Sequence, residues 1–304
     1  MSFVLEAAEV SLNVILPIFL VVGVAAAFSR HQQPDTKMLS GMVIYLFNPC
    51  LVVDSLIKTN ISGEKIGKIV LLVVVLHLIM MGVGWTVSKG LKFSRSRESA
   101  FMLSVMLINA ANYGIPFNEF AFGQDARQIA VIFWLATMMV NYTLGVYVAS
   151  RGNVSTPQAL RNIITIPTGY AMVVGFTLNL ADMNLPLPIM RAVSLLADGA
   201  IPVMLVMLGF QVSHLSLRGN PKPMLMAACL RLFIGPLVGL ILVTLLQLEG
   251  LTRNVIIVES AMPTAVIAGV LATEFGSDSE FTASVILLST VASVVTLSFL
   301  AAIL

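Results

Sequence analysis

Two asparagines inside a strongly apolar stretch are the first residues of this chain that could bind a ligand. The stretch reads NAANYGIP and places Asn109 and Asn112 shortly before Gly114 and Pro116. A side-chain amide donates to a carboxylate and accepts from a cation, so both asparagines are candidate substrate ligands. Pro116 lacks a backbone donor and is expected to interrupt the helix beside them. Hydrogen bonding to a neighbouring helix is the alternative role for each asparagine.

A second polar stretch, ESAMPT, interrupts an apolar segment near the other end of the chain. Pro263 predicts a second helix break there, and Thr264 is the polar residue that follows it. In lipid, irregular backbone survives only where it is buried in protein or lines a cavity. The two breaks together therefore predict a substrate site whose residues are Asn109, Asn112, Pro116, Pro263 and Thr264.

Glu259 is the acidic residue of the second stretch, and Ser260 follows it. An ionised carboxylate inside a membrane segment is costly, which makes such a residue a functional candidate. The cost falls if the group is protonated or if a sodium ion lies beside it. We therefore expect Glu259, Ser260 and Asn112 to bind the coupling proton or sodium ion. Pairing of Glu259 with Arg253 at the interface is the alternative.

Two acid–lysine pairs have the i,i+4 spacing of ion pairs on a helix surface. They are Glu64 with Lys68 and Asp54 with Lys58. We expect solvated pairs at both positions, although Glu64 and Lys68 are also secondary site candidates.

Three single ionisable residues inside apolar segments complete the secondary candidates: His77, Asp198 and Arg231. His77 could carry protons or hydrogen-bond within the core. Asp198 comes shortly before Pro202, so it could stabilise a kink. Arg231 could extend to the membrane surface, or it could neutralise Glu259 or a substrate carboxylate.

The overall composition is typical of an integral membrane protein. Of the 304 residues 58% are hydrophobic and 11% charged, whereas soluble domains carry about 25% charged residues. The formal charge of +2 does not indicate a nucleic-acid partner. HExxH, GxSxG and P-loop motifs are absent from the sequence, so we expect no enzyme, no cofactor and no metal apart from sodium near Glu259.

Ten apolar segments are long enough to cross a membrane, which takes about 20 residues. They lie at about 4–28, 37–58, 65–88, 98–121, 127–149, 157–180, 187–213, 223–247, 253–275 and 279–303. The connections that follow odd-numbered segments carry ten Lys and Arg residues, and the others carry six. The excess predicts that the odd connections are cytoplasmic and that both termini lie outside. The N-terminus lacks a basic region, so no cleaved signal peptide is expected.

An internal repeat divides the chain near its midpoint. FGQD at 122–125 recurs as FGSD at 275–278, an offset of 275 − 122 = 153 residues, and Pro49 and Pro202 have the same offset. Each half would hold five helices, and an odd number reverses membrane orientation. We therefore predict an all-α protein of two inverted five-helix repeats, 1–152 and 153–304, with helices 4 and 9 broken. Substrate sites in such proteins lie where the repeats meet.

Four stretches of the chain resemble the auxin efflux carrier family. They are NAANYGIPF, VNYTLGVY at 140–147, DGAIPVMLVMLGFQ at 198–211 and SAMPTAVIAGVLATEFGSD at 260–278. The resemblance implies a scaffold of helices 1, 2, 6 and 7, about 1–60 and 157–215. It implies a mobile transport domain of helices 3–5 and 8–10, about 64–150 and 221–304, in which helices 4 and 9 cross. A homodimer through the scaffold is also implied.

By motif position, Asn109 is similar to the carboxylate-contacting asparagine of that family, and Pro116 and Pro263 to its crossing prolines. Glu64 and Lys68 resemble an acid–lysine pair associated there with a supporting network. Glu259 is similar instead to a ninth-helix glutamate of the bile-acid/sodium symporters, a related fold in which it helps to hold sodium.

The resemblance and the residues together predict a secondary transporter of small organic anions, such as carboxylates or dicarboxylates, in a bacterial inner membrane. Its expected mechanism is elevator-like alternating access coupled to protons or sodium. One alternative is a sodium-coupled carrier of amphipathic anions, as in the bile-acid symporters. Another is a channel or sensor built on the same scaffold.

Overall fold

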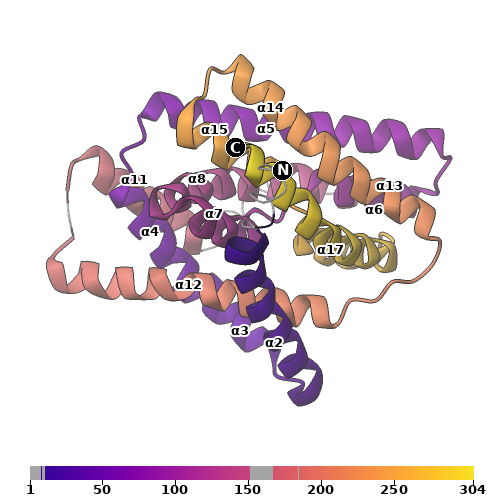
Figure 1. Ribbon diagram of the computed structural model, residues 1–304, viewed down its shortest axis with the longest axis horizontal. Coiled ribbons are helices and arrows are strands. Elements are labelled where there is room, and N and C mark those ends of the chain that lie inside the picture. Colours follow the sequence, from indigo (N-terminus) through magenta and orange to yellow (C-terminus); the bar gives the residue numbers. More distant parts are fainter. Residues whose placement is uncertain (1–7, 9–10, 151–166, 184) are drawn as a thin grey trace.

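The computed structural model describes residues 8, 11–150, 167–183 and 185–304 (Figure 1). The expected connection at 150–156 and the start of the sixth expected span fall almost entirely outside these residues. Within them, helices and turns account for the regular structure apart from one isolated β-bridge. Short π-helical turns, written η, interrupt several helices.

The first half contains η1 (Ser11–Ile15), α2 (Leu16–Gln32), α3 (Thr36–Met42), η2 (Val43–Phe47), α4 (Asn48–Lys58), α5 (Gly63–Gly90), α6 (Arg95–Met106), η3 (Ala110–Gly114), α7 (Ile115–Phe122), α8 (Gln124–Val140), η4 (Asn141–Gly145) and α9 (Val146–Ser150). The second half contains α11 (Pro167–Leu180), α12 (Leu187–Ser213), α13 (Pro221–Cys229), η5 (Leu230–Ile234), α14 (Gly235–Leu245), α15 (Gly250–Ser260), α16 (Val266–Glu274) and α17 (Ser279–Ile303).

Seven helical segments of the described residues are long and apolar enough to cross a membrane: Leu12–Gln32, Thr36–Lys58, Gly63–Gly90, Gln124–Ser150, Leu187–Ser213, Pro221–Leu245 and Ser279–Ile303. They match the first, second, third, fifth, seventh, eighth and tenth expected spans. The fourth and ninth expected spans are each divided into two shorter helices. The sixth is represented by the 14-residue α11.

The helices pack in two groups. In the first group α2 lies along α12, and α4 packs against both α11 and α12. In the second group α5 packs on α6 and α8, α14 on α15, and α17 on α13 and α16. Figure 1 shows α12, α3 and α2 on one side of the protein and α5 and α14 on the opposite side. Of the broken helices, α6 and α7 lie between them (Figure 1).

The two broken helices meet at their interruptions. After α6 the chain is extended at Leu107 and makes a tight turn at Asn109, and before α16 it is extended at Ala265. Ile108 and Thr264 form an antiparallel β-bridge. The backbone N–H of Asn109 donates to the carbonyl of Pro263 and that of Ala265 to the carbonyl of Leu107, each at 3.0 Å. These bonds satisfy backbone groups that the breaks release.

Pro116 does not make the first break, so that expectation is wrong. The interruption lies at Leu107–Asn109, and Pro116 lies inside the helical run that follows it, directly after the π turn η3. The π turn η3 precedes it, with the N–H of Gly114 bonded to the carbonyl of Asn109 at 3.1 Å. This wider turn lets the helix run on from Ala110 to Phe122.

The FG pairs of the internal repeat have the same structural role. Gly123 follows the end of α7 with φ +85°, and Gly276 follows α16 with φ +68°. A positive φ favours glycine because it has no Cβ. The sequence repeat therefore marks the same chain reversal after the second half of each broken helix.

Gly209 is needed for the close contact of α12 with α2. A Cβ there would lie 2.5 Å from the carbonyl oxygen of Val22 and 2.7 Å from the Cβ of Ala25. Such overpacking costs about 1–3 kcal/mol, so we expect Gly209→Ala to lower the thermal unfolding midpoint in detergent by several degrees. The matched control is Gly23→Ala on exposed α2 surface with nothing within 4 Å. Equal midpoints for the two variants would contradict the proposed packing.

Candidate functional site

A cavity of about 380 Å³ lies between the two helix groups, beside the crossing of the broken helices. The first group contributes residues of α3, η2, α11 and α12, together with Asn48 at the start of α4. The second contributes the first break, η3, α8, η4 and the start of α16. Its polar lining residues are Ser40, Tyr45, Asn48, Asn109, Asn112, Trp134, Asn141, Tyr142, Thr168 and Gln211. Of the residues that line it, none carries a charged side chain.

Five side-chain amides supply most of the hydrogen-bonding capacity of this cavity. Asn112 Nδ2 donates to Gln211 Oε1 at 3.4 Å and so connects the two groups. Asn109 Nδ2 is buried without a partner, as are the Oδ1 atoms of Asn48 and Asn141. Leaving buried polar atoms unpaired costs about 1–3 kcal/mol each. A polar ligand in the cavity would remove that cost.

Two helix N-termini also point their first turns at the cavity. Ala111 and Asn112 of η3, and Val266 and Ile267 of α16, are all among its lining residues. The first N–H groups of a helix have no intrahelical acceptor and carry partial positive charge. With no basic side chain in the lining, these helix ends are the positive elements of the site. They suit a small anion.

Asn109 and Asn112 are thus brought to the cavity, but the other three predicted substrate residues are not among its lining. Pro116 lies within the helical run η3–α7, and the Pro263 carbonyl accepts from the N–H of Asn109 at the crossing. Thr264 is fully buried, and its hydroxyl donates to the carbonyl of Ser104 at 2.7 Å. Its backbone N–H donates to Ser289 Oγ at 3.2 Å. The hydroxyl and backbone N–H of Thr264 therefore pair with residues at the crossing and do not face the cavity.

Glu259 is fully buried on α15 and is not among the residues that line the cavity. Its Oε1 accepts from Asn118 Nδ2 at 3.0 Å, while Oε2 has no partner. Its carboxylate packs so closely on Gly114 that a Cβ there would collide with it. The alternative pairing with Arg253 is not found, because the Arg253 guanidinium donates to Asn254 Oδ1 at 3.3 Å.

Ser260 and Asn112 do not join Glu259 in one polar cluster. Ser260 Oγ donates to the carbonyl of Ile256 at 2.7 Å, and Asn112 turns to Gln211. Asn118 is instead the polar side chain that contacts the carboxylate, and its Oδ1 is also without a partner. Glu259 Oε2 and Asn118 Oδ1 are thus two buried oxygens without a hydrogen-bond partner.

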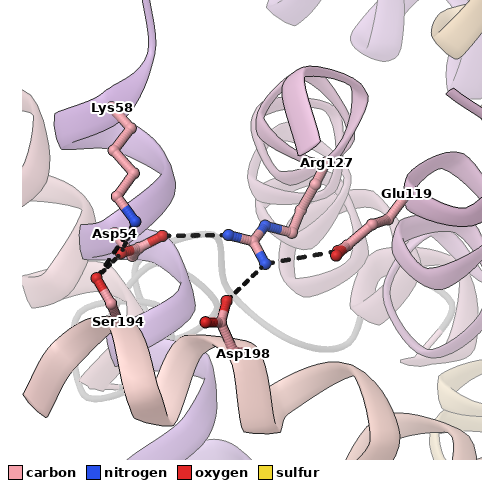
Figure 2. Close-up of polar contacts among 6 residues, drawn as sticks. All are labelled: Asp54, Lys58, Glu119, Arg127, Ser194 and Asp198. Atoms are coloured by element: carbon pink, nitrogen blue, oxygen red, sulfur yellow. Dashed lines mark hydrogen bonds and ion pairs between the residues drawn. The ribbon is translucent and has the colours of Figure 1, made fainter. Parts of the chain in front are cut away.

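Arg127 on α8 is the centre of a second polar cluster, which also joins the two groups (Figure 2). Its Nη2 lies 3.3 Å from Asp54 Oδ2 on α4. Its Nη1 lies 3.0 Å from Asp198 Oδ1 on α12 and 3.5 Å from Glu119 Oε2 on α7. Asp54 Oδ1 also binds Lys58 Nζ and Ser194 Oγ, each at 2.6 Å. The predicted pair of Asp54 with Lys58 is confirmed, but the expectation that it is solvated is wrong, because Asp54 is fully buried within a larger network.

This ion-pair network and the cavity occupy opposite halves of the same helices. The cavity uses Asn48, at the start of α4, and Gln211, near the end of α12. The network uses the last turns of α4 and the first half of α12, where Asp198 lies. At 1.5 Å per residue, Asp198 and Gln211 are roughly 20 Å apart along the helix axis.

The remaining secondary candidates lie outside both clusters. Glu64 and Lys68 form the predicted exposed ion pair, at 2.8 Å. His77 is fully buried, and its Nδ1 lies 2.7 Å from the carbonyl of Val73 one turn earlier. Arg231 is also fully buried, so the expectation that it extends to the membrane surface is wrong. It hydrogen-bonds two backbone carbonyls instead.

Several residues of the two clusters were not predicted as candidates: Asn48, Glu119, Arg127, Asn141 and Gln211. Each is a polar residue within or beside an apolar segment, which is the same signal that identified Asn109. Asn141 and Gln211 also fall inside the stretches VNYTLGVY and DGAIPVMLVMLGFQ.

Comparison with known proteins agrees with a transport role. The profile of the membrane transport protein family matches the chain twice, at residues 10–155 and 151–301. An uncharacterised transporter of Methanocaldococcus jannaschii is 26% identical over 297 residues, covering 94% of this chain and 95% of the relative. One from Methanothermobacter thermautotrophicus is 26% identical over 271 residues, covering 87% and 88%. The two matches to one profile indicate an internal repeat. The chain therefore belongs to the membrane transport protein family, the auxin efflux carrier family, and is a multi-pass membrane transporter, not an enzyme.

Proposed function

We propose that this transporter carries small organic anions, carboxylates or dicarboxylates, by secondary active transport. The observation that supports this most is the cavity, where the free amide donor of Asn109 and two helix N-termini converge without a charged side chain. Its volume of about 380 Å³ lies near the lower end of the range for ligand pockets. A small acid suits that volume better than an amphipathic anion of bile-acid size.

The proposed architecture is ten membrane helices in two inverted repeats of five, with broken helices 4 and 9. The double match of the family profile and the crossing of the broken helices support it. We assign the first helix group to a fixed scaffold, about 1–60 and 157–215, and the second to a moving transport domain, about 64–150 and 221–304. A homodimer through the scaffold stays a prediction.

The two polar clusters fit opposite roles in an elevator cycle. By the charge rule, the Thr36 end of α3 is cytoplasmic, and so is the half of the protein that holds the cavity. The ion-pair network then lies on the outer half, where it fastens α7 and α8 to α4 and α12. We infer an inward-facing state whose outer side the network keeps closed.

Glu259 is proposed as the coupling group, with a proton as the favoured ion. A buried carboxylate that has one amide donor and no cationic partner is costly when ionised. Protonation removes that cost, and a change of access during the cycle would allow the proton to leave. Sodium, held by Glu259 Oε2 and Asn118 Oδ1, is the alternative that the experiment below separates.

The amide site is tested with Asn109→Ala. Losing a hydrogen bond to a charged group costs about 1.5–3 kcal/mol, so we expect the dissociation constant to rise at least about tenfold. A thermal-shift screen with malate, malonate and aromatic acids selects the substrate, and counterflow in proteoliposomes measures its transport. The matched control is Asn254→Ala, an amide outside the cavity that donates to the terminal carbonyl of Leu304. Unchanged binding in Asn109→Ala removes that residue from the site, and absent trans-stimulation indicates a channel.

The outer closure is tested with Arg127→Gln in a chain whose two cysteines have been replaced by alanine. A cysteine at Ala111 then reports access to the cavity through a thiol reagent that cannot cross the membrane. Because the variant removes the cation that joins both groups, labelling from outside should rise several-fold. Arg218→Gln breaks the exposed pair with Glu280 and should leave labelling unchanged. Equal labelling of both variants would exclude the closing role of the network.

Coupling is tested with Glu259→Gln, which keeps an acceptor for Asn118 but cannot ionise. We expect counterflow to continue while uptake loses its dependence on an imposed pH gradient. Replacing sodium with choline should have no effect on uptake by the unmodified protein. A pH dependence that survives in the variant would assign coupling to another group.

A further inference from the structure

Arg231 is the largest fully buried side chain outside both polar clusters. It lies in η5, the π turn between α13 and α14. In the described part of the chain, no ion pair joins its guanidinium to a carboxylate, and Glu259 is bonded to Asn118 instead. Burying an unpaired cation is expensive. Something other than an acidic side chain must therefore stabilise it.

The guanidinium binds the carbonyl ends of both broken helices. Its Nη1 donates to the carbonyl of Val105 at 3.2 Å, and its Nη2 donates to the carbonyl of Ser260. Val105 lies in the last turn of α6, and Ser260 is the last residue of α15. One side chain thus joins the C-terminal ends of the first halves of the two broken helices.

The breaks themselves leave these two carbonyls free. In an unbroken helix, the Val105 carbonyl would accept from the N–H of Asn109, which donates to Pro263 instead. The Ser260 carbonyl would accept from the N–H of Thr264, which donates to Ser289 Oγ. Arg231 takes both places, so its position follows from the two interruptions.

Two glycines of α14 make room for this arrangement. A Cβ on Gly235 would collide with Arg231 Nη2 and lie 2.6 Å from the Ser260 carbonyl oxygen. A Cβ on Gly239 would lie 2.5 Å from Ser260 Oγ. The glycines of the GPLVG stretch therefore let α14 approach the end of α15 closely enough for the guanidinium to reach its carbonyl.

The charges also match. Each helix C-terminus carries roughly half a negative charge, so two of them together balance one guanidinium. In transporters with broken helices, such carbonyl ends are where mobile cations bind. We infer that Arg231 is a fixed cation of the crossing: it holds the place of a metal ion there, and the crossing needs no bound sodium at any step. The inference that transport needs no sodium at the crossing rests on the proposed function. The structural role of Arg231 does not.

The first test measures thermal unfolding in detergent without any substrate. Arg231→Lys keeps the charge and Arg231→Met removes it at similar length. We expect the methionine variant to lose several degrees and the lysine variant to lose clearly less. In a Glu259→Gln background, which removes the other candidate sodium site, the midpoint should be the same in sodium chloride and in choline chloride. A methionine variant as stable as the lysine variant, or a sodium-dependent midpoint in that background, overturns the inference.

The second test uses guanidinium chloride, far below denaturing concentrations, as the probe. Arg231→Ala leaves a space with two free carbonyls, so guanidinium should raise its midpoint but not that of the unmodified protein. The matched control is Leu232→Ala, a buried truncation in the same turn that leaves no free carbonyls. Equal responses of the two variants would overturn the inference. Because neither test uses an organic anion, both give an answer even if the proposed substrate class is wrong.

Discussion

The structure depends on how two interrupted helices satisfy their backbone inside the protein. Each break releases N–H and C=O groups that lipid cannot solvate. Backbone pairing across Ile108 and Thr264 takes up part of them, the Thr264 hydroxyl takes the Ser104 carbonyl, and Arg231 takes two more carbonyls. These backbone groups at the crossing therefore have specific hydrogen-bond partners. Helix N-termini are left facing the cavity, while helix C-termini are covered by a cation.

The same pair of helix groups is joined by two clusters of different chemistry. At the cavity the link is a neutral amide contact between Asn112 and Gln211, which a ligand can replace at little cost. At the other half the link is ionic and centred on the buried Arg127. In the proposed alternating-access cycle, the neutral contact lies on the open side and the ionic contact on the closed side.

Much of the fold follows from local sequence signals, but the two clusters only partly do. The apolar segments and the presence of two breaks were predictable from local composition. The pairs Asp54–Lys58 and Glu64–Lys68 were predictable because their partners are one helix turn apart. The contacts of Arg127 and of Arg231, which was itself a predicted candidate, were not. Their partners lie 71 to 126 residues away, apart from Ser260 at 29 and the neighbouring Glu119. No periodicity within a segment reports such contacts.

By itself the sequence determined that the chain is a helical membrane protein with an internal repeat and two interruptions, because hydropathy and polar residues inside apolar segments are local signals. The exact place of the first interruption, Leu107–Asn109 rather than Pro116, was decided by the tertiary structure. Only the tertiary structure decided which polar residues at the breaks face the cavity. Asn109 lines it, whereas Thr264 turns to Ser104 and Glu259 to Asn118. The reason is physical: at a break, a side chain is directed by the backbone groups of the opposite helix that need a partner, and folding alone brings that helix into place.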